Sequence, residues 1–351
     1  MSEDEEVKKE IHKISFSSDN SMFSFGTEKG FIVCTTKPFN IITNKEMKGG
    51  FLFAEVIDNS NIIALVGDDK NEFFPNTKVI FYDEFESKKI SELKFGYPIR
   101  NLKAIANYIF VVLKDTIYFF KITNLSIISK FKTYEKNENG VFAVSKKNKE
   151  IIFCFPDVEL GNIKVIKYNE KMEKEEKVLC AHVSRIACLN LNKEANLICS
   201  ASDTGTLIRV FNIENGNLTH EFRRGTEKAQ IFSLDFSSSN EFLSCTSDRG
   251  TVHIFNLKKS GNENLEKVQK GSLFNGLKRL LKAPSNVISA PRSFAMFRIN
   301  DINTFSVFGP DEQLFVVSTD GNGKFFEIGF DKKNGGETVN ADVYQILDES
   351  P

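Results

Sequence analysis

The sequence predicts an all-β fold, a seven-bladed β-propeller whose blades each contain four antiparallel strands. Three observations carry this prediction. A pattern of strand, tight turn and strand recurs when the chain is shifted by 45 residues against itself, short apolar segments alternate with turn residues, and the 351 residues hold about seven such units. A period of this length is typical of blades like those of tryptophan-aspartate repeats, although the chain contains no tryptophan.

The repeat is clearest in two segments, 197–206 and 242–251. Each begins with an apolar strand and ends in a Ser-Asp-x-Gly-Thr turn, a sequence that suits the connection of two antiparallel strands in a hairpin. Weaker copies at 25–31 and 317–325 extend the repeat toward both ends of the chain. The blades can therefore be assigned outward from this central pair.

Strand candidates fill the remaining blades. The second blade would use 51–57, 61–66 and 79–82, the third 109–113, 117–121 and 127–132, and the fourth 141–144, 151–155 and 163–168. We interpret the charged segment 169–177 as a solvated connection. The fifth and sixth blades would occupy about 183–222 and 229–299, and 304–328 would supply most of the seventh.

The chain thus divides into an acidic N-terminal segment at 1–10, a single propeller at 11–330, and a segment at 331–351 that is either a tail or a closing strand. The N-terminal segment is polar, unlike the basic and then apolar start of a secretory signal. The longest apolar run, 105–113, falls short of the roughly 20 residues of a membrane span. We expect a soluble, cytoplasmic protein.

Composition argues against several classes of function. The chain has 46 basic and 47 acidic residues, so polyanion binding requires a local patch, and a nucleic-acid partner is not expected. The six cysteines form no Cys-x-x-Cys pair, and we interpret them as reduced core residues. The four histidines lack the spacing of a metal motif. We expect no metal site, no cofactor and no catalytic residues.

A pair of adjacent arginines, Arg223 and Arg224, lies between the two clear repeats, in the segment 220–225. Successive side chains of a strand point to opposite faces, so the pair can serve two separate anion sites. Each guanidinium offers a planar fork of donors that suits phosphate, and Gly225 leaves room for a ligand to approach the backbone. The alternative is a charged, solvated loop.

Three features together resemble the PROPPIN family, seven-bladed propellers that bind polyphosphoinositides and include the WIPI proteins of autophagy. They are the motif from Phe222 to Gly225, the two hydroxyl-rich hairpins beside it, and a long interruption of the sixth blade. The resemblance is specific over about 178–300 and architectural elsewhere. Two departures are Phe222, where some relatives have Leu, and Cys245, where the repeat partner has Ser200.

The resemblance implies two lipid sites that share the arginine pair. The first would contain His182, Ser200, Ser202, Thr206, Arg209 and Arg223, and the second Arg224, Gly225, Ser247, Thr251 and His253. Hydroxyl and imidazole groups would donate to phosphate oxygens, and the arginines would supply charge. Alternatively, the hydroxyls belong to ordinary hairpin turns, and Arg209 and His253 are satisfied strand residues.

A long insertion, 258–292, interrupts the sixth blade between strand candidates at 252–257 and 293–299. It carries eight Lys/Arg and two Glu, and apolar residues recur in it at helical spacing: Leu273, Phe274, Leu277, Leu280 and Leu281. A stripe of this kind beside basic residues suits shallow insertion into an anionic bilayer, and a helix packed on the propeller rim is the alternative. The resemblance implies a membrane-inserting loop.

The resemblance further implies a monomeric effector of phosphatidylinositol 3-phosphate, phosphatidylinositol 3,5-bisphosphate or both. Such a protein would bind phosphoinositide-containing membranes peripherally, at autophagosomal precursors, endosomes or the vacuole or lysosome, and recruit autophagy or endolysosomal proteins. A rival interpretation is a propeller scaffold in which the arginines bind an acidic peptide without lipid specificity. An enzyme is the third class, and the sequence offers it no paired carboxylates or activated nucleophile.

Overall fold

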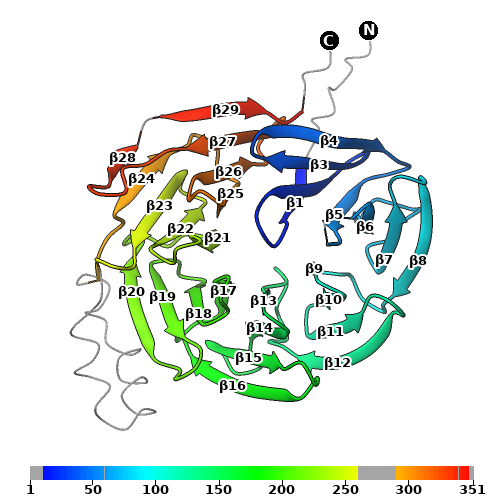
Figure 1. The fold of residues 1–351 in the computed structure, drawn as a ribbon, viewed down its shortest axis with the longest axis horizontal. Helices are drawn as coiled ribbons and strands as arrows, with labels where there is room; N and C mark the ends of the chain where they lie inside the picture. Colours follow the sequence, from blue (N-terminus) through cyan, green and yellow to red (C-terminus); the bar gives the residue numbers. More distant parts are fainter. Residues whose placement is uncertain (1–10, 59, 260–289, 339, 348–351) are drawn as a thin grey trace.

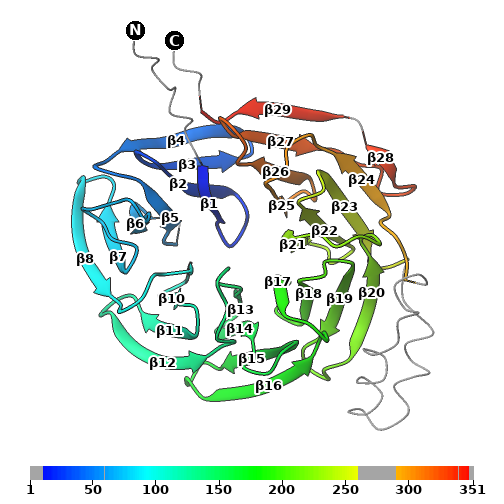
Figure 2. The same cartoon turned by 180° about the vertical axis from the view of Figure 1, so that it is seen from behind.

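The structure is a computed structural model that describes residues 11–58, 60–259, 290–338 and 340–347. Seven antiparallel sheets, each containing four consecutive or nearly consecutive strands, form a closed ring (Figures 1 and 2). The first strand of each blade lies toward the centre and the last lies at the rim. The predicted seven-bladed propeller is confirmed.

The first four blades follow the chain in simple order. Blade 1 is β1 (Ile11–Phe16), β2 (Met22–Thr27), β3 (Gly30–Thr36) and β4 (Phe39–Glu46). Blade 2 is β5 (Phe51–Val56), β6 (Ile62–Gly67), β7 (Lys78–Asp83) and β8 (Lys88–Lys94). Blade 3 is β9 (Asn101–Ile105), β10 (Tyr108–Val112), β11 (Thr116–Lys121) and β12 (Ser126–Lys132). Blade 4 is β13 (Ala143–Lys147), β14 (Glu150–Pro156), β15 (Asn162–Tyr168) and β16 (Lys174–Cys180).

The last three blades contain the repeat and the end of the chain. Blade 5 is β17 (Ile186–Leu191), β18 (Leu197–Ser202), β19 (Leu207–Asn212) and β20 (Leu218–Arg223). Blade 6 is β21 (Ile231–Phe236), β22 (Phe242–Ser247), β23 (Thr251–Asn256) and β24 (Ala295–Arg298), with β28 (Gly336–Thr338) added in parallel to β24. Blade 7 is β25 (Thr304–Phe308), β26 (Leu314–Ser318), β27 (Lys324–Ile328) and β29 (Ala341–Gln345).

The interpretation of 169–177 as a connection was wrong, because β16 begins within it. This strand pairs with β15 along its whole length, from Tyr168 opposite Lys174 to Asn162 opposite Cys180. As the outermost strand of blade 4 it has little to bury, and its first five residues are all exposed. The continuous apolar run that marks an inner strand is therefore missing from its sequence.

Side chains pack between neighbouring blades, so the inner strands are apolar on both faces. Phenylalanine takes much of this volume. The rings of Phe110 and Phe119 stack at 4.5 Å within blade 3, and Phe110 lies 4.8 Å from Phe153 of blade 4. Offset and tilted ring pairs of this kind add stabilisation beyond the burial of apolar area, which explains how a chain without tryptophan fills seven interfaces.

The ring closes between blades 7 and 1 through side chains. The C-terminal strand β29 pairs with β27 and is the outermost strand of blade 7. The adjoining core joins Ile346 and Phe325 to Phe23 and Ile32 of blade 1. Among the described residues the two blades share no strand, and β1 and β29 belong to neighbouring blades (Figure 1).

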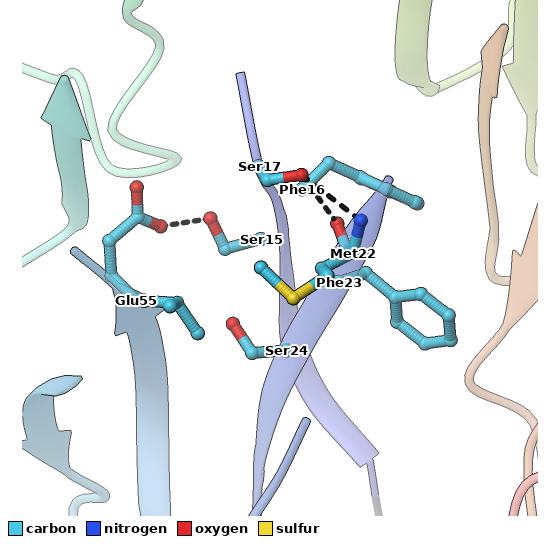
Figure 3. A pocket seen from close by; sticks show the side chains of 8 residues that line it. Ser15, Phe16, Ser17, Met22, Phe23, Ser24 and Glu55 are labelled. Atoms are coloured by element: carbon cyan, nitrogen blue, oxygen red, sulfur yellow. Dashed lines mark hydrogen bonds between the residues drawn. The ribbon is translucent and has the colours of Figure 1, made fainter. Parts of the chain in front are cut away.

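Two buried carboxylates bridge inner strands of different blades. Glu55 of β5 accepts hydrogen bonds from Ser15 of β1 and from the Ala104 amide of β9 at 2.9 Å, and Figure 3 shows it pointing toward Ser15. Asp235 of β21 accepts from the Phe308 amide of β25 at 2.7 Å and from Asn190 of β17 at 3.0 Å. These contacts hold the blades in register around the ring.

Candidate functional site

The arginine pair lies at the end of β20, the outermost strand of blade 5. Arg223 is the last residue of this strand, and Arg224 follows it. The strand lies against blade 6, since the rings of Phe222 and Phe255 stack at 4.8 Å and the Arg223 amide donates to the Pro291 carbonyl at 2.8 Å. The pair therefore lies on the rim, where blades 5 and 6 meet.

Alternation along β20 separates its residues between two blade interfaces. Phe222 packs into the core between blades 5 and 6. Glu221, on the opposite face, binds Arg209, whose guanidinium also reaches Ala181 of blade 4. Arg223 shares the face of Glu221 because side chains two apart on a strand point the same way.

The first cluster, on the blade 4 side, consists of buried polar groups. His182 Nε2 lies 3.0 Å from the Ser200 hydroxyl, and the two share a hydrogen bond. Arg209 donates from Nε to Glu221 at 2.7 Å and from its terminal nitrogen to the Ala181 carbonyl at 2.8 Å. Burial, and then the charge of Arg209, holds the pKa of His182 well below its usual range, so the imidazole is neutral.

Arg209 thus differs from an open anion-binding arginine. Only 5% of its surface is exposed, and two of its donors are engaged by Glu221 and a backbone carbonyl. Sequence reasoning missed Glu221, although a signal existed: in the hairpin of β19 and β20, Glu221 lies directly opposite Arg209. A phosphate at this cluster would meet Arg209 through its remaining N–H groups.

The hairpin turn between β18 and β19 joins the two clusters. Ser202, at the end of β18, shares a hydrogen bond with Thr204 at 2.9 Å. The Thr206 carbonyl accepts from the Arg224 amide at 2.9 Å, and the Gly205 carbonyl accepts from Arg224 Nε at 2.6 Å. Gly205 has a φ of 62°, and a Cβ there would lie 2.0 Å from the Ala229 carbonyl, so glycine is required.

The second cluster surrounds Arg224 and lies on blade 6. The Ser247 side chain is fully buried, and its hydroxyl has no hydrogen-bond partner among the described residues. His253 lies 3.3 Å from the Ser293 hydroxyl through Nδ1. Burial, together with the charge of Arg224, lowers the pKa of His253 to about 4, so this imidazole is also neutral at physiological pH. Thr251 begins β23 and is partly exposed.

Arg224 is half-buried, and its guanidinium also donates to the Glu227 carbonyl. Burial lowers the pKa of this guanidinium from its ordinary value, which leaves it charged at neutral pH. Cys245 replaces the serine of the repeat partner and is fully buried, with burial raising the pKa of its thiol. The second cluster therefore lacks the hydroxyl donor that Ser200 provides in the first.

Gly225 follows the arginine pair in open space. A Cβ at this position would meet no atom within 4 Å. The protein itself therefore does not require glycine here, and the residue leaves the approach to Arg224 uncovered. The five apolar residues of the long insertion, Leu273, Phe274, Leu277, Leu280 and Leu281, lie outside the described residues.

The described residues lack a metal-binding cluster and a membrane-spanning helix. They contain no group of three or more His, Cys, Asp or Glu side chains placed to hold a metal ion. Within the same part of the chain, no helix is long and apolar enough to cross a membrane. The six cysteines, all among the described residues, form no disulfide with one another, and four of them are buried.

The fold is a seven-bladed β-propeller, and the two clusters are paired candidate anion sites on its rim. A family model described as PROPPIN matches residues 11–347. The chain belongs to the PROPPIN family.

Relatives and solved structures agree with this assignment. Autophagy-related protein 18e of Arabidopsis thaliana is 30% identical over 95% of this chain and 88% of its own length. Autophagy-related protein 18 of Schizosaccharomyces pombe is 28% identical over 90% of this chain and 93% of its own. The structure of Kluyveromyces lactis Hsv2 has a TM-score of 0.72 at 20% identity, covering 96% and 98% of the two chains, and shares the fold.

Proposed function

We propose that this propeller is a phosphoinositide effector that binds phosphatidylinositol 3-phosphate, phosphatidylinositol 3,5-bisphosphate or both, through two rim sites. The observation that carries the proposal is the position of Arg223 and Arg224. They follow one another at the end of one outer strand. Arg223 shares the strand face of Glu221, the partner of Arg209 in the first cluster, and the charge of Arg224 acts on His253 of the second.

The chemistry of the two clusters suits phosphate. The arginines bring charge and a planar fork of donors, while neutral His182 and His253 and the hydroxyls of Ser200 and Ser247 can donate hydrogen bonds without adding charge. The buried Ser247 hydroxyl would gain the partner it lacks among the described residues. Desolvated donors of this kind cost little to reorganise when a headgroup binds.

Avidity would supply most of the membrane affinity. Each headgroup site is weak alone. When one of two sites on a rigid rim holds a lipid, the other site meets a higher effective concentration of lipid in the same membrane. The insertion 258–292, with an excess of six positive charges, would add attraction to anionic lipid, and its apolar residues would enter the bilayer. Recruitment would then require both the correct lipid and an anionic surface.

At such a membrane the propeller would recruit proteins of the autophagy or endolysosomal machinery. Two observations support this role. The relatives named above are autophagy-related proteins. A complex of KlAtg21 with the coiled-coil of AgAtg16 has a TM-score of 0.74 to this chain at 21% identity, which favours a protein-binding surface elsewhere on a propeller of this fold.

The two-site proposal can be tested with the soluble headgroup inositol 1,3-bisphosphate. The parent protein should bind two molecules, and Arg223→Thr and Arg224→Thr should each bind one. Calorimetric titration measures the stoichiometry, and circular dichroism checks the fold. Unchanged binding by the folded double variant would remove the proposal and favour an acidic peptide as the ligand of the arginines.

The role of the insertion has its own test. Leu273→Asp, Phe274→Asp and Leu277→Asp together should weaken binding to vesicles while sparing the soluble headgroup. Sedimentation with vesicles measures the first quantity and titration the second. Equal loss of both would argue against insertion and for a packed helix.

A further inference from the structure

Three exposed apolar side chains gather on two loops of blade 4. Val158 and Leu160 belong to the loop between β14 and β15, and Val183 belongs to the connection from β16 to blade 5. Their exposed fractions are 55%, 53% and 59%. We refer to Val158, Leu160 and Val183 as the blade 4 apolar patch. Grouped apolar residues at a surface are typical of interaction sites.

The two loops are locked together through Gly161. Its carbonyl accepts from the His182 amide at 2.9 Å and from the Ala181 amide at 3.1 Å. A Cβ on Gly161 would lie 2.0 Å from the His182 carbonyl, and its φ of 78° favours glycine. Leu160 and Val183 therefore flank a fixed backbone contact, and their positions on the surface are set by the fold.

This contact directly adjoins the first cluster. His182, which precedes Val183, bonds to Ser200, and the Ala181 carbonyl accepts from Arg209. Consecutive Cα atoms are about 3.8 Å apart, so a headgroup that reaches His182 brings the bilayer surface to Val183. The patch therefore lies beside the headgroup site.

The charges around the patch are mixed. Arg185, two residues after Val183, has 44% of its side chain exposed and lies 4.0 Å from Asp203. Lys164 is paired with the buried Asp157 at 3.1 Å. Glu159, between Val158 and Leu160, is exposed, and its carboxylate accepts a hydrogen bond from Asn162 at 2.9 Å. A shallow, interfacial position suits this combination, since charged groups can stay among the headgroups.

We propose that the blade 4 apolar patch is a second membrane contact, which enters the headgroup region of the bilayer when the first site holds a phosphoinositide. The inference rests on the proposed function and adds to it a contact outside the insertion 258–292. Contacts on blade 4 and on blade 6 would fix the tilt of the propeller, which a single contact leaves free. Adjacency to the first cluster favours a lipid surface over a protein partner.

The chain contains no tryptophan, so one introduced indole reports its own surroundings without background. We expect Leu160→Trp and Val183→Trp to show blue-shifted emission, and quenching by brominated lipid, on vesicles that contain phosphatidylinositol 3-phosphate. Arg223→Thr with Arg224→Thr should abolish both signals. Phe85→Trp, at a position of blade 2 that is 85% exposed, is the matched control and should keep its aqueous spectrum.

A second pair of variants measures the contribution to affinity. Leu160→Ser with Val183→Ser should weaken vesicle binding about tenfold and leave binding of soluble inositol 1,3-bisphosphate unchanged, because only the apolar contact is lost. Phe85→Ser should change neither quantity.

The outcomes separate the inference from the function on which it rests. If vesicle-bound protein keeps aqueous spectra at both 160 and 183, the patch does not touch the bilayer, while the phosphoinositide function stands. Equal loss of vesicle and headgroup binding in the serine variant would assign the patch a structural role and overturn the inference. If the parent protein ignores phosphoinositide vesicles, both proposals fall.

Discussion

In the two proposed sites, charge and hydrogen-bond donors come from different residues. His182 and His253 are neutral because burial lowers the pKa of each imidazole, so the positive charge rests on arginine. Arg209, an expected lipid ligand, forms an ion pair with Glu221, which offsets its positive charge. Its presence in the site therefore depends on a partner that the motif does not reveal.

Breaking the pair of Arg209 and Glu221 should show that it is structural. Both side chains are almost fully buried, at 6% and 8% exposure. Glu221→Gln leaves a buried guanidinium without its counter-charge and should lower the free energy of unfolding by about 3 kcal/mol, measured by urea denaturation.

The control replaces both partners. Arg209→Met with Glu221→Leu fills the same volume with apolar groups and should recover much of the lost stability. A Glu221→Gln variant as stable as the parent would mean that Arg209 does not need the carboxylate.

The candidate residues were predictable to the extent that they follow the repeat. The hydroxyls at 202 and 206 match those at 247 and 251 in the repeat, and the arginine pair stands between the two hairpins. The partners of these residues were not predictable, because Pro291, at the end of the long insertion, and Ser293, just after it, are distant from them in the sequence. Contacts across such a separation depend on the closed ring and leave no local pattern.

Among the elements, apolar strands were predicted well, as was the outer strand β12 at 127–132, while several strands that carry mainly polar residues were missed. The segments at 109–113 and 151–155 are apolar on both faces, and the structure has β10 and β14 there. β16 was missed because its first four residues are charged and exposed. β28 was missed because it has only three residues, of which two are exposed. An outer strand is specified mainly by its backbone pairing, which the side-chain pattern does not encode.

The C-terminal strand β29 should stabilise the whole ring. Ile346, one residue beyond it, is 1% exposed in the core between blades 7 and 1, whereas Val343 within the strand is 54% exposed. Ile346→Ala removes buried methyl groups and should lower the free energy of unfolding by about 3 kcal/mol, while Val343→Ala should change it by less than about 0.5 kcal/mol. Similar effects at the two positions in thermal denaturation would contradict closure by this core.

At the scale of the molecule, the buried carboxylates that bridge blades make stability depend on pH. Burial raises the pKa of Asp235 from 3.8 to about 7 in the folded protein. The folded chain therefore keeps this proton where the unfolded chain has lost it, and the contribution of Asp235 to stability falls as pH rises from about 4 through about 7.

Asp235→Asn removes this titration, and comparison with the parent isolates it from other groups. Between pH 5 and pH 8 the difference in unfolding free energy should shift in favour of the variant by roughly 2–3 kcal/mol. Urea denaturation at both pH values measures the difference. A constant difference would mean that the carboxylate titrates near its ordinary pKa in the fold.

The arginine pair on the rim is the central claim, and flotation with liposomes tests it most directly. The parent protein and the Arg223→Thr/Arg224→Thr variant would be mixed with neutral vesicles that contain no phosphoinositide or a single one. We expect the parent to float selectively with 3-phosphorylated lipids and the folded variant to stay behind. Failure of the parent to float, or equal flotation of both proteins on any anionic lipid, would contradict the account.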